Sequence, residues 1–217
     1  LNALMVRVTS AELEAVRRIP GVESAKFAAE YDLLMDGALP LLQVPEAWAL
    51  PAIGGEENAG RGLKIAIIDT GIDHTHPIFQ DGQLAAPAGF PKGETAFTNN
   101  KVIVARNFTT ERSAADTRGH GTFVAGVAAG RRIPAQPPQG PVVSISGVAP
   151  KAFLGNYRVF PTTGRAQETA LVQAIESAVL DGMDIINLSQ GTADAPPPSV
   201  HPNARAIQNA IAAGVVV

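Results

Sequence analysis

Two residues far apart in this sequence, Asp69 and His120, have the types and surroundings of an acid–base pair. Asp69 follows an apolar run in the segment IIDTGIDHTHP (residues 67–77), and Gly71 lets the backbone turn sharply behind it. His120 lies 51 residues downstream, between two glycines at the start of a stretch of small residues. A carboxylate that accepts the hydrogen bond of one imidazole nitrogen leaves the other nitrogen ready to take a proton from a hydroxyl. These residues therefore predict the acid and the base of a nucleophilic triad, in the chain order Asp, His, Ser.

The letters DTG allow a second interpretation, in which Asp69 is one carboxylate of an aspartic-protease pair. That class needs a serine or threonine directly after DTG, and a second motif or a dimer to supply the other carboxylate. Ile72 follows here, the sequence has no second DTG, and its helix-rich pattern disagrees with an all-β lobe. His120 is therefore the expected partner of Asp69.

The composition predicts a globular protein and excludes several classes of function. The chain has 217 residues, 46% of them hydrophobic, which is enough for one large domain or one domain plus a small one. A formal net charge of -3 without long runs of one sign makes neither nucleic acid nor a membrane an expected partner. Without cysteine, the chain has no disulfide, zinc–thiolate site or thiol nucleophile. No apolar run reaches the ~20 residues of a membrane-spanning helix.

The elements that must position the pair follow an alternating pattern from residue 62 onward. Apolar strands alternate with helices, which is typical of a parallel sheet covered on both faces. In such sheets functional sites form at the carboxyl ends of the strands, and Asp69 lies at one of these ends. Strands are expected over 63–69, 101–108, 151–160 and 184–189, helices over 119–130, 165–182 and 202–214, and loops over 81–100 and 134–141.

The first residues of the chain have a different pattern. Residues 3–9 and 22–28 have the composition of short strands, and a helix between them is expected to begin at a capping box formed by Thr9 and Glu12. Pro20 and Gly21 would end this helix. The next segment, residues 33–51, holds three prolines and is interpreted as a linker.

Several motifs resemble those of the subtilisin-like serine proteases, the subtilases. The segment AIIDTGIDHTH is similar to the family's sequence around its catalytic aspartate, and HGTFVAGVAAG to the one around its catalytic histidine. Further along, GVAPKAFLGNYRVF, DIINLSQG and AIQNAIAAGVVV resemble later strands and a helix of the catalytic domain. The first segment, ALMVRVTSAELEAVRRIPGVESAKF, is similar to the second half of the family's inhibitory propeptide.

The resemblance implies an α/β, parallel-sheet subtilisin-like three-layer fold, truncated, with a small α+β propeptide-like unit at the N-terminus. Residues 1–35 would be the end of an inhibitor and chaperone propeptide, and residues 36–217 the N-terminal portion of a catalytic domain. The implied function is that of a secreted serine endopeptidase acting by acyl transfer, with its own propeptide as intramolecular inhibitor and polypeptides as substrates. Asp69 and His120 would be catalytic, and Ser189, Gln190 and Gly191 would bind substrate. The family's oxyanion-hole asparagine and nucleophilic serine would follow Val217, so the chain by itself is expected to be inactive.

This sequence also departs from the family at several positions. In the family an acid often follows His-Pro and binds calcium, whereas here the segment is His76, Pro77 and Ile78; no metal site is expected here, and calcium stays open for the full-length protein. The pair His74 and His76 is interpreted as part of a turn, and Asp73 as a loop hydrogen-bonding residue. Because the nucleophile is not in the sequence, a noncatalytic subtilase-like binding module is the alternative function.

Overall fold

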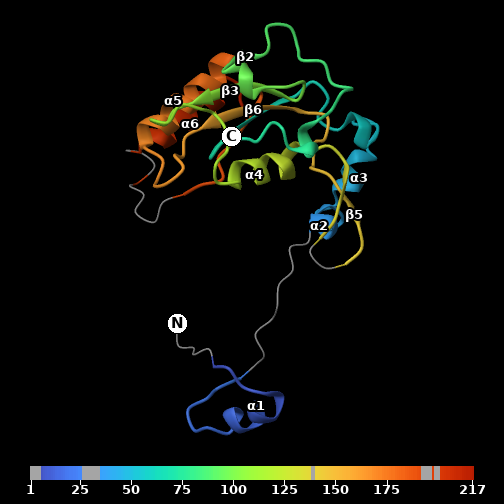
Figure 1. Cartoon of the computed structure of the whole chain (residues 1–217), viewed down its shortest axis with the longest axis vertical. Helices are drawn as coiled ribbons and strands as arrows, with labels where there is room; N and C mark the ends of the chain where they lie inside the picture. Colours follow the sequence, from blue (N-terminus) through green and yellow to red (C-terminus); the bar gives the residue numbers. More distant parts are fainter. Residues whose placement is uncertain (1–5, 26–34, 138–139, 192–196, 198–200) are drawn as a thin grey trace. The chain divides into compact units, whose positions relative to one another are not determined.

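The computed structural model of the chain describes residues 6–25, 35–137, 140–191, 197 and 201–217, and divides into two compact units. The first is Leu1–Leu34 and the second Met35–Val217 (Figure 1). This division lies next to the expected boundary at residue 35, while the propeptide role of the first unit stays a prediction. None of the helices in the described ranges is both long and apolar enough to cross a membrane.

In the residues that the structure describes, the first unit contains one helix, α1 (Ser10–Arg17), which begins as expected. The Thr9 side chain accepts from the backbone N–H of Glu12, and the Glu12 carboxylate accepts from the backbone N–H of Thr9, so the capping box is complete. The strand predictions for 3–9 and 22–28 are wrong where they can be compared, because residues 6–9 and 22–25 have no strand partner. The other residues of these two segments lie outside the described ones.

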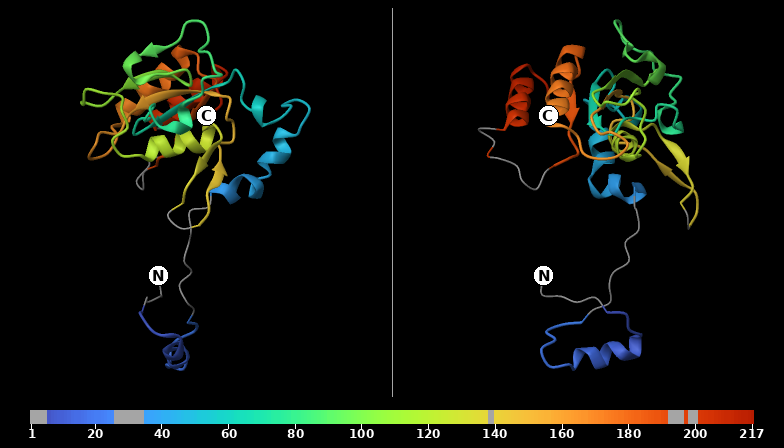
Figure 2. Two further views of the ribbon diagram at one scale, coloured as in Figure 1. Left: turned by 45° about the vertical axis from the view of Figure 1, so that its right-hand side comes forward. Right: turned by 60° about the vertical axis from the view of Figure 1, so that its left-hand side comes forward.

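The second unit is built on a five-stranded sheet in the order β2-β3-β6-β1-β7, in which all pairs are parallel. Helices cover both of its faces, α4 on one side and α5 and α6 on the other (Figure 2). The predicted three-layer α/β fold is therefore confirmed. The elements are β1 (Lys64–Asp69), β2 (Lys92–Gly93), β3 (Val102–Asn107), α4 (His120–Ala129), β6 (Phe153–Arg158), α5 (Glu168–Asp181), β7 (Ile185–Asn187) and α6 (Pro202–Ala212).

The alternation of side chains along β1 sets the side of the sheet on which the site forms. Ile65 and Ile67 belong to the apolar core on the α4 side, and Ala66 and Ile68 to the core on the α5 side. Because successive side chains of a strand point to opposite faces, Asp69 lies on the α4 side. The last residue of β1 therefore faces the helix that begins at His120.

The structure differs from expectation in segments rich in proline. The linker interpretation of 33–51 is wrong in part, since this segment forms α2 (Met35–Leu41) and α3 (Val44–Trp48). Pro45 lies in the first turn of α3, where a missing N–H costs no helical hydrogen bond, and the indole of Trp48 donates to the carbonyl of Val148 at 2.8 Å. Pro134 and Ala135, expected in a loop, belong to a two-stranded antiparallel sheet, and Lys92 and Gly93, within the expected loop 81–100, form β2. Short 3-10 turns occur in three loops of the described residues. These elements are β4 (Ile133–Ala135), β5 (Val143–Ile145), η1 (Glu56–Asn58), η2 (Pro77–Phe79) and η3 (Thr95–Phe97).

Candidate active site

Asp69 and His120 lie in direct contact at the carboxyl edge of the sheet. The Nδ1 atom of His120 is 2.8 Å from Asp69 Oδ1 and 2.9 Å from Oδ2, and the backbone N–H of Thr70 donates to Oδ1 at 2.7 Å. The carboxylate is buried, with 1% of its side chain exposed, while 53% of the His120 side chain is exposed. A carboxylate can only accept, so Nδ1 carries the shared proton. In the neutral ring Nε2 is then the basic nitrogen.

Two glycines allow the aspartate loop and the histidine helix to approach this closely. A Cβ atom on Gly121 would lie 2.2 Å from the carbonyl oxygen of Gly71 and 3.1 Å from Cβ of Asp69. Gly71 has a φ of 116°, and its own Cβ would lie 2.7 Å from the backbone nitrogen of Asp116. The small residues around DTG and HGT therefore set the distance between the acid and the base.

A third polar residue of the site, Asp116, was not identified from the sequence. Burial by itself raises the pKa of this carboxyl, but hydrogen bonds from Thr122, Arg118 and Gly119 outweigh it and leave the pKa below its usual value. Asp116 lies four residues before His120, and the N-cap position of α4 is occupied by Gly119, so the usual capping signal does not point to it. The carboxylate accepts five hydrogen bonds, from the side chains of Thr70 and Thr122 and from the backbone of Arg118, Gly119 and Thr122.

The expected substrate-binding residues, Ser189, Gln190 and Gly191, follow the end of β7. Asn187 is in register with Ile67 of β1, so Ser189 leaves the sheet at the level of Asp69. The Ser189 hydroxyl donates to Asn187 Oδ1 at 2.8 Å. The structure thus places this segment at the same edge of the sheet as the acid–base pair, while no hydrogen bond within the described residues joins the two.

The neighbouring histidines and Asp73 have local roles in the loop after β1. The Nδ1 atom of His76 accepts from the backbone N–H of Ile78 at 3.2 Å, and Asp73 Oδ1 accepts from the backbone and hydroxyl of Thr75 at 2.9 and 2.6 Å. These contacts agree with the turn and loop roles expected from the sequence. Ile78 is buried in the apolar core under α4, and no group of three metal-ligating side chains occurs in the described part of the chain. The residues present at this position do not fit a calcium ion.

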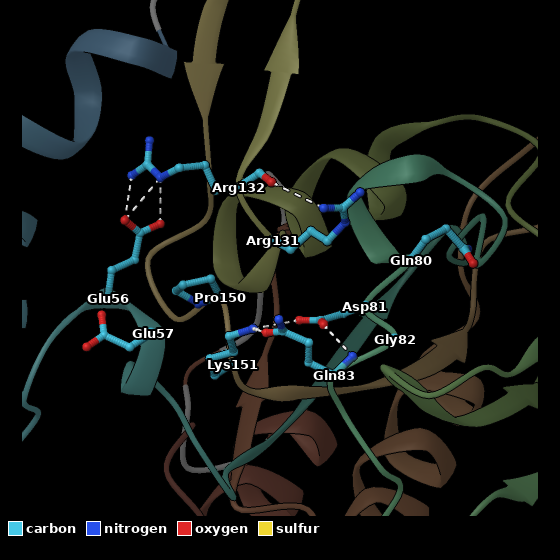
Figure 3. A pocket seen from close by; sticks show the side chains of 10 residues that line it. All are labelled: Glu56, Glu57, Gln80, Asp81, Gly82, Gln83, Arg131, Arg132, Pro150 and Lys151. Atoms are coloured by element: carbon cyan, nitrogen blue, oxygen red, sulfur yellow. Dashed lines mark hydrogen bonds and ion pairs between the residues drawn. The ribbon is translucent and has the colours of Figure 1, made fainter.

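A cavity of about 440 Å³ lies away from the acid–base pair (Figure 3). Its walls include the segments that precede β1 and β6, so it is at the amino ends of the strands, opposite to Asp69. Figure 3 shows two ion pairs in its walls, Arg132 with Glu56 and Lys151 with Asp81. The cavity is separate from the candidate active site.

Near this end of the sheet, a fully buried lysine joins two neighbouring strands. Lys101 directly precedes β3, and its Nζ atom donates to the carbonyls of Pro150 and Ala152, before β6, at 2.7 and 2.9 Å. Burial lowers the pKa of this ammonium to about 7; the carboxylate of Asp81 opposes this shift, and the charge of Lys151 adds to it.

The chain is similar to known proteins over most of its length. Residues 60–217 match the model of a family described as the Subtilase family. Subtilisin-like protease SBT2.1 of Arabidopsis thaliana is 35% identical over 196 residues, which cover 76% of this chain and 23% of that protein. Subtilisin-like protease SBT2.6 of the same plant is 29% identical over a 248-residue alignment, which covers 100% of this chain and 30% of that protein. Minor extracellular protease Vpr of Bacillus subtilis (strain 168) is 34% identical over 161 residues, 72% of this chain and 16% of that protein. The chain thus spans less than a third of each of these relatives.

Proposed function

The chain belongs to the subtilase family, and from this premise we propose that it carries the acid and the base of a serine endopeptidase. The observation that supports this most strongly is the contact between His120 Nδ1 and the buried carboxylate of Asp69. In this geometry the carboxylate fixes the tautomer, and the other ring nitrogen can act as general base.

In the proposed reaction, His120 acts first as base and then as acid. Its Nε2 takes the proton of a serine hydroxyl as that oxygen attacks the scissile carbonyl, and later gives the proton to the leaving amine. Asp69 holds the ring and stabilises the imidazolium that forms between these steps. The serine and the oxyanion-hole asparagine are proposed to be encoded after Val217, so the 217-residue chain itself would be inactive.

The substrate would be a polypeptide in extended conformation. The backbone of Ser189, Gln190 and Gly191 leaves β7 at the level of Asp69, and it would pair with the substrate backbone by strand addition. Gln190 makes this wall of the cleft polar. This role rests on the family resemblance and on the position of the segment at the carboxyl edge of the sheet.

We further propose that residues 1–35 are the end of an inhibitory propeptide and that the protein is exported. The first proposal is supported by the sequence resemblance and by the separation of Leu1–Leu34 as a compact unit. The second is supported by the relative whose name describes an extracellular protease.

The test is peptide hydrolysis by the full-length gene product and its variants. Asp69→Asn is expected to lower kcat by about 10⁴-fold, because the asparagine amide would select the wrong histidine tautomer. His120→Ala is expected to lower it by a similar factor. Asp73→Asn, which removes the same charge four residues away, is the matched control and should retain activity, since its carboxylate serves only a local turn. A folded full-length protein without peptidase activity would instead support the noncatalytic binding module.

A further inference from the structure

We propose that Asp116 is a positioning residue that holds His120 on Asp69. This inference rests on the proposed function and assigns to Asp116 the task of fixing the two backbone segments that carry the pair. One segment is the loop after β1, which begins at Thr70, and the other is the first turn of α4.

The carboxylate of Asp116 contacts both of these segments. Its Oδ1 atom accepts from the hydroxyl of Thr70 and from the backbone N–H groups of Arg118 and Gly119, each at 2.9 Å. Its Oδ2 atom accepts from the backbone N–H and the hydroxyl of Thr122, at 3.0 and 2.5 Å. Thr70 is the neighbour of Asp69, and Thr122 lies two residues after His120. One carboxylate therefore joins the residues that flank the acid and the base.

Each of the two threonines also accepts a hydrogen bond from the segment opposite to its own. A hydroxyl has a single proton, and Thr70 uses it on Asp116, so its oxygen is free to accept from the backbone N–H of Gly121 at 2.8 Å. Thr122 likewise donates to Asp116 and accepts from the backbone N–H of Asp73 at 2.9 Å. Because the Asp116 carboxylate can only accept, it fixes the direction in which both hydroxyls donate.

An amide cannot replace this carboxylate without a conflict. Each of its two oxygens accepts at least one backbone N–H, from Gly119 and Arg118 on one side and from Thr122 on the other. A backbone N–H cannot reverse its direction. Whichever way an asparagine side chain is oriented, its NH₂ group would face another donor, and leaving such a group unpaired is costly.

The contact between the segments leaves little room to absorb such a conflict. The carbonyl of Gly71 packs against Gly121 so closely that a methyl group at Gly121 would lie 2.2 Å from it. A shift of the loop at Asp116 therefore moves the start of α4 relative to the end of β1. The distance between His120 Nδ1 and the Asp69 carboxylate would change with it.

The experiment measures the tautomer of His120 by long-range ¹H–¹⁵N NMR on the 217-residue chain. The wild-type ring is expected to carry its proton on Nδ1, and Asp116→Asn to shift the ring toward a mixture of tautomers while the amide spectrum of β3 and α5 stays native. Thr70→Val, which cuts the link between Asp116 and Gly121, should shift the tautomer in the same direction and decides the matter if Asp116→Asn does not fold. Asp73→Asn, with the same loss of charge, should leave the tautomer unchanged. An unchanged tautomer in Asp116→Asn and Thr70→Val, or an equal change in Asp73→Asn, would overturn the proposal.

In the full-length gene product, Asp116→Asn is expected to lower kcat by roughly 100-fold with little change in KM, as a misplaced base would do. Unchanged kcat in Asp116→Asn, together with a large loss in Asp69→Asn, contradicts the role of Asp116 and leaves the proposed function intact. A tautomer shift in Asp116→Asn, together with unchanged activity in Asp69→Asn, supports the positioning role and contradicts the proposed function.

Discussion

At the scale of single residues, the absence of side chains is as important for this site as the acid and the base. Gly121 directly follows His120 and contacts the backbone of Gly71, where a β-carbon has no space. The same helix contains Gly126, at which an added Cβ would make an ordinary 3.6 Å contact with Ile78. Neither Gly121 nor Gly126 has a positive φ, so packing alone distinguishes them.

This difference predicts opposite effects for two substitutions to alanine. Gly121→Ala is expected to lower the free energy of unfolding by about 1–3 kcal/mol, because it overpacks a contact between backbones. Gly126→Ala, the matched control, is expected to leave it unchanged or to raise it by up to about 1 kcal/mol through helix propensity. Urea unfolding followed by the fluorescence of Trp48, the single and buried tryptophan, measures both. Equal effects of the two substitutions would show that the close contact between Gly121 and Gly71 does not exclude a side chain at Gly121.

At the scale of elements, Lys101 connects the start of β3 to the start of β6, the central strand of the sheet. Burial lowers the pKa of this lysine from 10.5 to about 7 in the folded chain. At pH values between about 7 and 10.5, Lys101 is protonated in the unfolded chain and neutral in the folded chain. Folding then releases a proton, so the stability contributed by this residue rises with pH across the window.

We therefore expect a pH-dependent difference in stability between the wild type and Lys101→Met. The difference in free energy of unfolding, wild type minus variant, should increase from pH 7 to pH 9 by at most about 1.4 kcal/mol per pH unit. The loss of the bonds to Pro150 and Ala152 adds an offset that is the same at each pH. Urea unfolding at several pH values measures the difference, and parallel curves for the two proteins would contradict a buried lysine of lowered pKa.

The elements also show which parts of the structure could be predicted from sequence. The strand KIAIID is apolar on both faces, and α5 has a helical period with a stop at Gly182, so local pattern suffices for both. The helices α2 and α3 were missed because Pro40 and Pro45 are typical of linkers, although Pro45 occupies the one helical turn that tolerates proline. Short strands near the N-terminus were expected from composition alone, which does not show whether a partner strand exists.

At the scale of the whole molecule, the acid–base pair could be predicted because two separate motifs occur in one order. The network around Asp116 could not be predicted in this way, since it exists only when the loop after β1, the segment before α4 and the first turn of α4 meet. Its donors are the hydroxyls of Thr70 and Thr122 and the backbone N–H groups of Arg118, Gly119 and Thr122, and their role depends on that meeting. The family and the fold are established for this chain. The catalytic activity is a proposal, because the chain spans less than a third of each relative compared.

The most direct measurement of the central claim is the rate at which a fluorophosphonate labels the full-length gene product, with the labelled residue mapped by mass spectrometry. We expect rapid labelling of one serine encoded after Val217, a large loss of rate in His120→Ala, and no triad labelling of the 217-residue chain. Labelling of His120→Ala at the wild-type rate, or of a serine within residues 1–217, would contradict the assignment of Asp69 and His120 as two members of a catalytic triad.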